Sequence, residues 1–360
     1  MNALESQLEY CFQETLPELG HKVAVGPGVF WVRMPLPFSL DHINLWLLRD
    51  TLDGREGWTV IDSGIASDEI RQYWEQIFDN ELDGLPVLRV LCTHFHPDHL
   101  GLADWISHGG DHARWDVRLW MTLGEYTMGR LMGDSRGSSA GGEAAARHFA
   151  SHGLNDPDDL AQIRERAGYF SKLVPSVPTQ YRRVREADLV AIGGRSWRVI
   201  TGFGHSTEHC ALYCDALKLM ISGDMVLPRI STNVSVNDME PESNPLALYL
   251  ESLGRYEDLP ADTMTLPSHG KPFRGLHTRI AQLREHHVDR LQEVRDACAG
   301  SPQSAADIVP LMFKRKLDLH QMTFALGEAL AHLHVLWHAG EAVRHQGEDG
   351  VYRFSSSISL

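Results

Sequence analysis

The chain has 360 residues, of which 43% are hydrophobic, and a formal net charge of −15 at pH 7. This length exceeds what a single core usually holds, so we expect two domains. The acidic balance disfavours nucleic acid or an anionic membrane surface as the main partner. No run of about 18 apolar residues predicts a membrane span, so no membrane partner is expected.

The start of the chain and the cysteines bear on the cellular compartment. Met1–Gln7 has neither the basic nor the apolar segment of a secretory signal. The cysteines are odd in number and lack CxxC spacing, which is typical of reduced, buried thiols. We therefore expect a cytoplasmic protein with free cysteines at five positions: Cys11, Cys92, Cys210, Cys214 and Cys298.

A histidine-rich motif, Thr93–His99, follows the apolar, strand-like stretch Pro86–Leu91. Imidazole nitrogen and carboxylate oxygen are ligands that suit zinc and similar divalent ions. Residues two apart in an extended backbone point the same way, so His94 and His96 are expected to bind one ion. Asp98 and His99 would then turn towards a second ion. The alternative is a polar loop that is rich in histidine by chance, since the chain has 20 histidines.

The segment 125–185 differs from the rest of the chain in charge. It has nine Lys or Arg against seven Asp or Glu, a net of +2. It contains the small-residue stretch 133–142, which is typical of a flexible segment, and a helix-forming stretch over 158–173. We expect this segment to be helical.

Three further metal-type side chains follow strand-like stretches later in the chain. They are His205 in Gly204–His209, Asp224 after Ser222-Gly223, and His269 in Ser268-His269-Gly270. Glycine lies next to each of them, as expected where the backbone turns sharply. Strand ends that each carry such a residue indicate a site at one shared edge of a sheet.

Together, HxHxDH, GHSxxH, SGD and SHG resemble the motifs of the metallo-β-lactamase-fold hydrolase superfamily, over roughly residues 20 to 275. The resemblance implies an α+β fold, a four-layer αβ/βα sandwich of two mixed sheets with helices outside and metals at one edge. It gives a catalytic domain over 1–275, followed by a second domain over 276–360. It also implies that 125–185 is a helical, lid-like insertion, whose arginines would hold a carboxylate or the phosphates of a coenzyme A-like group. The alternative is a surface helix pair that only packs on the main domain.

The resemblance also implies the role of each motif residue. His94, His96 and His205 would bind one metal, Asp98, His99 and His269 the second, and Asp224 would bridge them. His209 is not a ligand in most relatives, so packing is its expected role. Asp62, at the end of a strand-like stretch, is expected to orient a ligand histidine.

Two ions about 3.5–4 Å apart share a water and lower its pKa towards neutrality, so that a bridging hydroxide attacks the substrate. Asp98 is the expected catalytic residue, because it is both a ligand and the nearest group able to relay a proton. The full ligand set favours two zinc ions, with manganese or iron as substitutes.

The C-terminal part, 276–360, predicts a small winged-helix-like domain. Helical spacing covers 278–299, a cap opens a short helix at 304, a third helix spans 323–339, and two short strands follow. Its nine basic and ten acidic residues do not suit a phosphate backbone, so packing on the catalytic domain or homodimerisation is favoured. Three histidines of the third helix are expected to be ordinary helix residues: His332, His334 and His338.

The favoured activity is hydrolysis of a small acyl compound, either a thioester such as an acyl-CoA or hydroxyacyl-glutathione, or a lactone. The alternative is a phosphodiesterase of the β-lactamase-like endoribonuclease type. The short separation of Asp224 and His269 counts against it, because the large insertion of nucleolytic relatives is absent. An iron-dependent persulfide dioxygenase and a catalytically inactive binding protein are less favoured.

Overall fold

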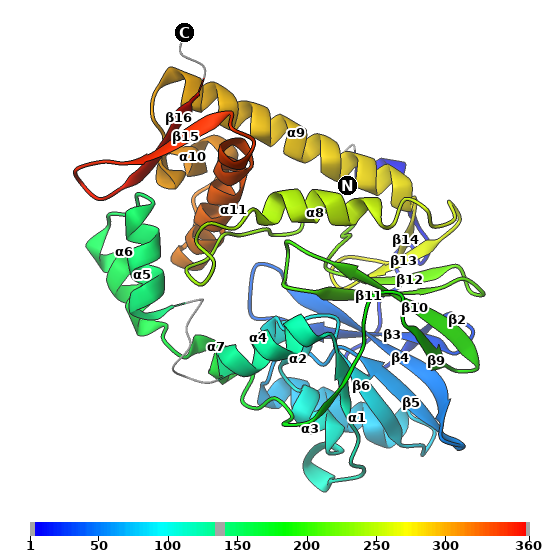
Figure 1. Cartoon of the computed structure of the whole chain (residues 1–360). Coiled ribbons are helices and arrows are strands. Elements are labelled where there is room, and N and C mark those ends of the chain that lie inside the picture. Colours follow the sequence, from blue (N-terminus) through cyan, green and yellow to red (C-terminus); the bar gives the residue numbers. More distant parts are fainter. Residues whose placement is uncertain (1–3, 134–140, 358–360) are drawn as a thin grey trace.

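The computed structural model describes residues 4–133 and 141–357 and contains two facing seven-stranded sheets (Figure 1). The first sheet has the order β2-β3-β4-β5-β6-β7-β8 and the second β1-β14-β13-β12-β11-β10-β9. Both are mixed, since β5 to β8 run parallel in the first sheet and β12 pairs parallel with β13 in the second.

The strands of the first sheet are β2 Val23–Gly26, β3 Val29–Pro35, β4 His42–Leu52, β5 Arg55–Ile61, β6 Val87–Leu91, β7 Leu119–Met121 and β8 Tyr181–Arg183. Those of the second are β1 Glu9–Tyr10, β9 Leu189–Ile192, β10 Arg195–Gly202, β11 His209–Cys214, β12 Leu219–Gly223, β13 Met264–Pro267 and β14 Phe273–Arg274. Short 3₁₀ turns lie at Glu5–Gln7 and Gly110–His112.

The outer face of the first sheet is covered by α1 (Asp68–Asn80) and α3 (Ala103–Ser107), which share its apolar core. The Ser67 side chain caps α1 by accepting a hydrogen bond from the Ile70 N–H. The buried residues of α1 recur at helical spacing, so one face of the helix lies on the sheet: Ile70, Trp74, Ile77 and Phe78.

The two sheets bury a core between them that includes Trp31 and Trp46 of the first sheet and Trp197 and Leu212 of the second. The outer face of the second sheet packs on α8 (Pro245–Gly254) and α9 (Leu276–Gly300). The layers are therefore helices, sheet, sheet and helices, and the predicted four-layer α+β sandwich is confirmed.

The insertion region contains four helices within its described residues: α4 Leu123–Gly133, α5 Gly142–Ser151, α6 Pro157–Glu165 and α7 Tyr169–Leu173. The prediction of one helix over 158–173 was wrong, because Gly168 takes a left-handed φ of 73° and separates α6 from α7. Most of the stretch predicted to be flexible, residues 134–140, lies outside the described part of the chain. The insertion is in contact with the sandwich, since the Ala66 N–H donates to the Leu173 carbonyl over 3.0 Å.

The C-terminal part has the predicted element order: α9, α10 (Ala305–Met312), α11 (Leu319–His338) and the hairpin β15 (Ala342–Gln346) and β16 (Tyr352–Ser356). The predicted start of α11 at 323 was wrong. A capping box of Asp318 and Gln321 starts the helix at Leu319, because each side chain satisfies a backbone N–H of the other residue.

Helix α11 packs on the catalytic part rather than standing apart (Figure 1). The Val236 N–H donates to the Gly327 carbonyl over 3.2 Å, and one apolar core contains residues of α8, α9, α10 and α11. The division of the chain at residue 275 stays a prediction.

Two smaller expectations concern membrane and cysteines. Within 4–133 and 141–357, no helix is long and apolar enough to cross a membrane. All five cysteines are free, but Cys11 is only half-buried, so the expectation that every thiol is buried was wrong at that position.

Candidate metal centre

The predicted ligands gather at one edge of the sandwich. Four strands each end one to three residues before a predicted ligand: β6 before His94, β10 before His205, β12 before Asp224 and β13 before His269. The sheets are tied together there, since the buried Asn44 side chain donates to the carbonyls of Pro267 and Gly270, both over 2.8 Å. His269 lies between these two anchored residues, so its loop is held against the first sheet.

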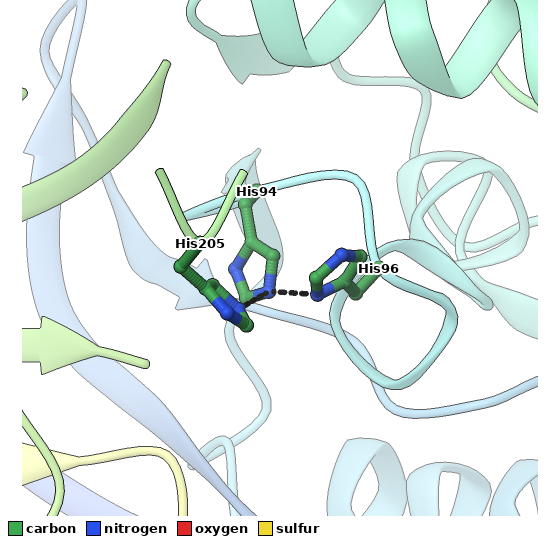
Figure 2. A group of neighbouring side chains, drawn as sticks. All are labelled: His94, His96 and His205. Carbon is green, nitrogen blue, oxygen red and sulfur yellow. Dashed lines mark hydrogen bonds between the residues drawn. The ribbon is translucent and has the colours of Figure 1, made fainter. Parts of the chain in front are cut away.

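Three histidines form the first group (Figure 2). His94 Nε2 lies 2.9 Å from His96 Nδ1 and 3.2 Å from His205 Nε2. Figure 2 shows the three rings converging from the Thr93–His99 loop and from the segment after β10. Three imidazole nitrogens so close together are a suitable donor set for one divalent ion.

Asp98, His99 and His269 form the second group. Asp98 Oδ2 lies 3.6 Å from His99 Nε2 and 3.4 Å from His269 Nε2. In the sequence motif, His94 and His96 thus fall in one group and Asp98 and His99 in another, while His94 and His99 also form a third group with Asp224.

Asp224 lies between the two groups and presents one oxygen to each. Its Oδ2 is 3.5 Å from His205 Nε2, whereas its Oδ1 is 3.6 Å from His99 Nε2 and 3.4 Å from His269 Nε2. A single carboxylate is thus placed as a bridge would be.

Hydrogen bonds to Nδ1 orient four of the five histidines. His205 donates to the Asn233 carbonyl and His269 to the His42 carbonyl, both over 2.7 Å, while His99 donates to Asp62 Oδ2 over 2.8 Å. His94 Nδ1 lies 3.0 Å from Thr93 Oγ1. These partners fix the Nδ1 side of each ring and turn Nε2 towards the centre, whereas His96 presents Nδ1.

Asp62 contacts a histidine of the second group, as expected for an orienting residue. Besides the His99 ring, its carboxylate accepts from the Thr93 N–H over 2.7 Å and from Thr93 Oγ1 over 2.9 Å. Asp62 has a left-handed φ of 62°, which is uncommon for a residue other than glycine. This strained backbone conformation places the Asp62 carboxylate against Thr93 and His99, where both of its oxygens accept hydrogen bonds.

Burial and neighbouring charges lower the pKa of some groups at the centre and raise the pKa of others. Burial and the neighbouring His205 lower the pKa of His96 to about 3. Burial would also lower the pKa of His269, but Asp224 and Asp98 outweigh it and raise it to about 10. Burial would raise the pKa of Asp98, but His99 and His269 outweigh it and lower it to about 2.

Two buried atoms at the centre make no hydrogen bond to any residue of the described chain: His99 Nε2 and Asp224 Oδ1. Both belong to the group of donors that faces inward, where an unpaired polar atom costs about 1–3 kcal/mol. Nitrogen and carboxylate donors left open in this way fit a divalent cation.

Glu125 is a functional residue that the sequence reasoning missed. Its buried carboxylate accepts from the Phe95 N–H over 2.9 Å, from Ser206 Oγ over 2.7 Å and from the Glu208 N–H over 2.5 Å. It therefore joins the loop of His94 and His96 to the segment of His205. Its sequence signal is weak, because two of its three partners are backbone groups.

His209 lies outside the three ligand groups that the described residues form. Its Nε2 accepts a hydrogen bond from the Asp224 N–H over 3.2 Å. A Cβ on Gly223 would stand 2.2 Å from the same nitrogen, so only glycine fits there. His209 thus holds the backbone of Asp224 in place through this hydrogen bond.

Comparison with known proteins agrees with this geometry. The model of the metallo-beta-lactamase superfamily matches residues 39–294, and that of the metallo-beta-lactamase-like, C-terminal domain matches residues 291–357. The crystal structure of a beta-lactamase domain protein from Burkholderia ambifaria has a TM-score of 0.94 and 66% identity, covering 99% of this chain and 100% of that one.

Two related proteins have descriptive names. The chain is 24% identical over 348 residues to the probable metallo-hydrolase YqjP of Bacillus subtilis, covering 91% of this chain and 98% of that protein. It is 25% identical over 274 residues to the acyl-coenzyme A thioesterase MBLAC2 of Gallus gallus, covering 74% and 85%. The fold, the divalent-metal-type donor clusters and these matches make the chain a metallo-hydrolase that belongs to the metallo-beta-lactamase superfamily.

Proposed function

We propose that this protein hydrolyses acyl thioesters and uses two divalent metal ions, with zinc favoured and manganese or iron as alternatives. Seven residues would hold the ions: His94, His96, Asp98, His99, His205, Asp224 and His269. The observation that carries the proposal is the position of Asp224, with Oδ2 towards the group of His205 and Oδ1 towards the group of His269.

When bound, the two ions would polarise the substrate carbonyl and supply a water of lowered pKa. The chain itself fixes the donors and holds the proton. Asp98 is the group best placed to accept a proton from that water, because its side chain is 18% exposed, compared with 10% for Asp224 and 3% for His269. Asp98 is therefore the most accessible of the three, while the other two lie deeper.

The thioester class is supported by the relative from Gallus gallus, whose name gives acyl-coenzyme A as its substrate. The insertion adds a physical reason. Phe170 of α7 packs on Phe95, with ring centroids 6.1 Å apart, so the insertion lies on the loop between His94 and His96. A segment in that position would cover an extended substrate.

The experiment is thiol release from a panel of acyl-CoA and hydroxyacyl-glutathione thioesters by the zinc-loaded protein. We expect turnover that disappears in Asp224→Ala, because this substitution removes a donor from both groups. If no thioester is hydrolysed, the thioester proposal fails, and lactones and then RNA become the substrates to test.

A further inference from the structure

His42, the first residue of β4, contacts the segment that carries the predicted ligand His269, although 227 residues separate the two in the chain. The His42 carbonyl accepts the His269 Nδ1–H over 2.7 Å. The His42 ring makes a second contact, because its Nε2 accepts the Gly270 N–H over 2.8 Å. His42 therefore holds the ligand at its ring and also at the peptide group that follows it.

The two hydrogen bonds of the His42 ring determine which nitrogen carries the proton. A backbone N–H can only donate, so the Nε2 that faces Gly270 is the acceptor and carries no proton. Nδ1 then carries the proton and donates it to Asp41 Oδ1 over 2.5 Å. The His42 side chain is 13% exposed, whereas that of Asp41 is 78% exposed. An accessible carboxylate thus keeps the inner nitrogen of His42 available to Gly270.

The backbone around His269 is otherwise held through carbonyl groups. The Asn44 N–H donates to the Ser268 carbonyl over 2.7 Å, and the Asn44 side chain donates to the Gly270 carbonyl over 2.8 Å. Neither bond reaches the peptide group that joins His269 to Gly270. In the described parts of the chain, the hydrogen bond to the His42 ring is the only one that this peptide group makes.

This peptide group needs an external anchor, because Gly270 supplies none. Gly270 has a left-handed φ of 91°, in a turn where glycine has more conformational freedom than any other residue. A rotation of the peptide group would turn the His269 side chain, whose Nε2 lies 3.4 Å from both Asp98 Oδ2 and Asp224 Oδ1. The His42 ring also stands against the His269 ring, with centroids 6.1 Å apart and planes at 70°.

We propose that His42 is a positioning residue for the second metal ion, because its ring holds the peptide group between His269 and Gly270 and so directs His269 Nε2 into the second group. The inference rests on the proposed two-ion centre and concerns how that same site retains one of its ions. The first group has other anchors, since His205 donates to the Asn233 carbonyl. Loss of the His42 ring should therefore affect one ion and not both.

Two amide substitutions separate the hydrogen bond from the bulk of the side chain. In His42→Gln the amide oxygen reaches about as far as Nε2, so it can still accept the Gly270 N–H. In His42→Asn the amide is one carbon shorter and reaches only as far as Nδ1, so this bond is lost. We expect His42→Asn to weaken the binding of one ion about 10- to 100-fold and His42→Gln to weaken it much less.

The measurement is a stepwise titration of the metal-free protein with Co²⁺, followed by its visible absorption in the presence of a competing chelator. One of the two binding steps should weaken in His42→Asn, and the other should keep the wild-type affinity. His21→Asn is the matched control, because His21 Nδ1 also bonds a carboxylate, that of Glu81, away from the metal donors. Urea unfolding of each metal-free variant shows whether the fold is intact.

Wild-type affinity in both steps of His42→Asn, or an equal loss in both steps, would overturn the inference. An equal loss in His42→Gln would do so too, because that variant keeps an acceptor for Gly270. If His42→Asn does not fold, Asp41→Ala decides, since it releases the His42 tautomer from an exposed position. It should weaken the same step by a smaller factor, and two unchanged steps would then overturn the inference.

The titration also separates this inference from the proposed function. A wild type that binds a single Co²⁺ would sink the two-ion centre, and the role of His42 with it, while thiol release still decides the thioesterase. Two ions bound with no hydrolysis of any thioester would sink the thioesterase alone. The comparison of His42→Asn with the wild type would still decide the role of His42, because it measures metal and not turnover.

Discussion

The carboxylate of Glu125 accepts a hydrogen bond from the backbone N–H of Phe95, the residue between two predicted metal ligands. The other oxygen of Glu125 accepts hydrogen bonds from the Ser206 hydroxyl and the Glu208 N–H, both in the segment that follows His205. One buried side chain at the start of α4 therefore fixes the spacing of the whole first histidine group. Burial raises the pKa of this carboxyl, and the three donors hold it in place.

Glu125→Gln should weaken metal binding without unfolding the protein. The amide has only one acceptor oxygen and meets donors on both sides, so the two segments are no longer held together. We expect a 10- to 100-fold loss of zinc affinity, as for other groups that orient ligands. A zinc titration against a competing chelator measures it, with the exposed Glu143→Gln as the control. Unchanged affinity would show that Glu125 only fills space.

Asp224→Ala and His96→Ala should each remove most of the bound metal and abolish turnover. His209→Ala should be much milder, because His209 contacts Asp224 only through its backbone N–H. Elemental analysis of the purified variants, with circular dichroism as a check of folding, separates the two classes. Full metal content and activity in Asp224→Ala, or complete metal loss in His209→Ala, would contradict the assigned donor set.

Gly327→Ala tests whether α11 supports the metal centre. Alanine normally stabilises a helix by about 1 kcal/mol relative to glycine. Here its Cβ would stand 2.7 Å from the Ser235 Cβ and Oγ, so it would push away the segment that orients His205. We expect weaker metal binding although the helix itself is favoured.

Ser235→Gly removes the two atoms that this Cβ would meet. The double variant Gly327→Ala/Ser235→Gly should therefore recover metal affinity, and Ser235→Gly alone measures the cost of losing the Ser235–Asn233 hydrogen bond. Metal affinity that stays at the wild-type level in Gly327→Ala would show that α11 and the histidine are not coupled.

Acid should destabilise the junction of the insertion and the C-terminal part. Burial lowers the pKa of His148 and His334 to about 4, and burial together with His148 lowers the pKa of His152 to about 3. The unfolded chain, with histidine pKa values near 6.5, then takes up protons first. The stabilisation is complete above about pH 6.5 and is lost as the pH falls towards 4, by the order of 2 kcal/mol per histidine.

Urea unfolding of the metal-free protein at several pH values measures this effect. The metal-centre histidines also titrate, so the informative quantity is the difference between wild type and His152→Gln. That difference should depend on pH between 6.5 and 4, and the exposed His345→Gln serves as the control variant. A His152→Gln difference that is constant with pH would contradict the prediction.

The sequence predicted the parts of the site that side chains define. His94, His205, Asp224 and His269 each follow an apolar strand, and the last three lie next to glycine. The structure brings the four residues together. Asp62 was named because it matches an acidic position at a strand end in the family that the motifs resemble. The start of α11 was also within reach, since Asp318-x-x-Gln321 is a recognisable capping pattern.

The remaining features depend on backbone groups, which no side-chain pattern marks. Glu125 binds the N–H groups of Phe95 and Glu208, and His205 is oriented by the Asn233 carbonyl. Any residue type supplies such groups, so only the fold shows which ones meet.

The hydrogen bond between Val236 and Gly327 connects the last helix to the segment whose Asn233 carbonyl orients His205. Because the contact uses main-chain atoms, many sequences of α11 would preserve it as long as the helix keeps its position and a small residue stays at 327. We therefore expect relatives with identical ligand residues to differ in metal affinity, because their C-terminal helices hold the segment behind His205 in different positions.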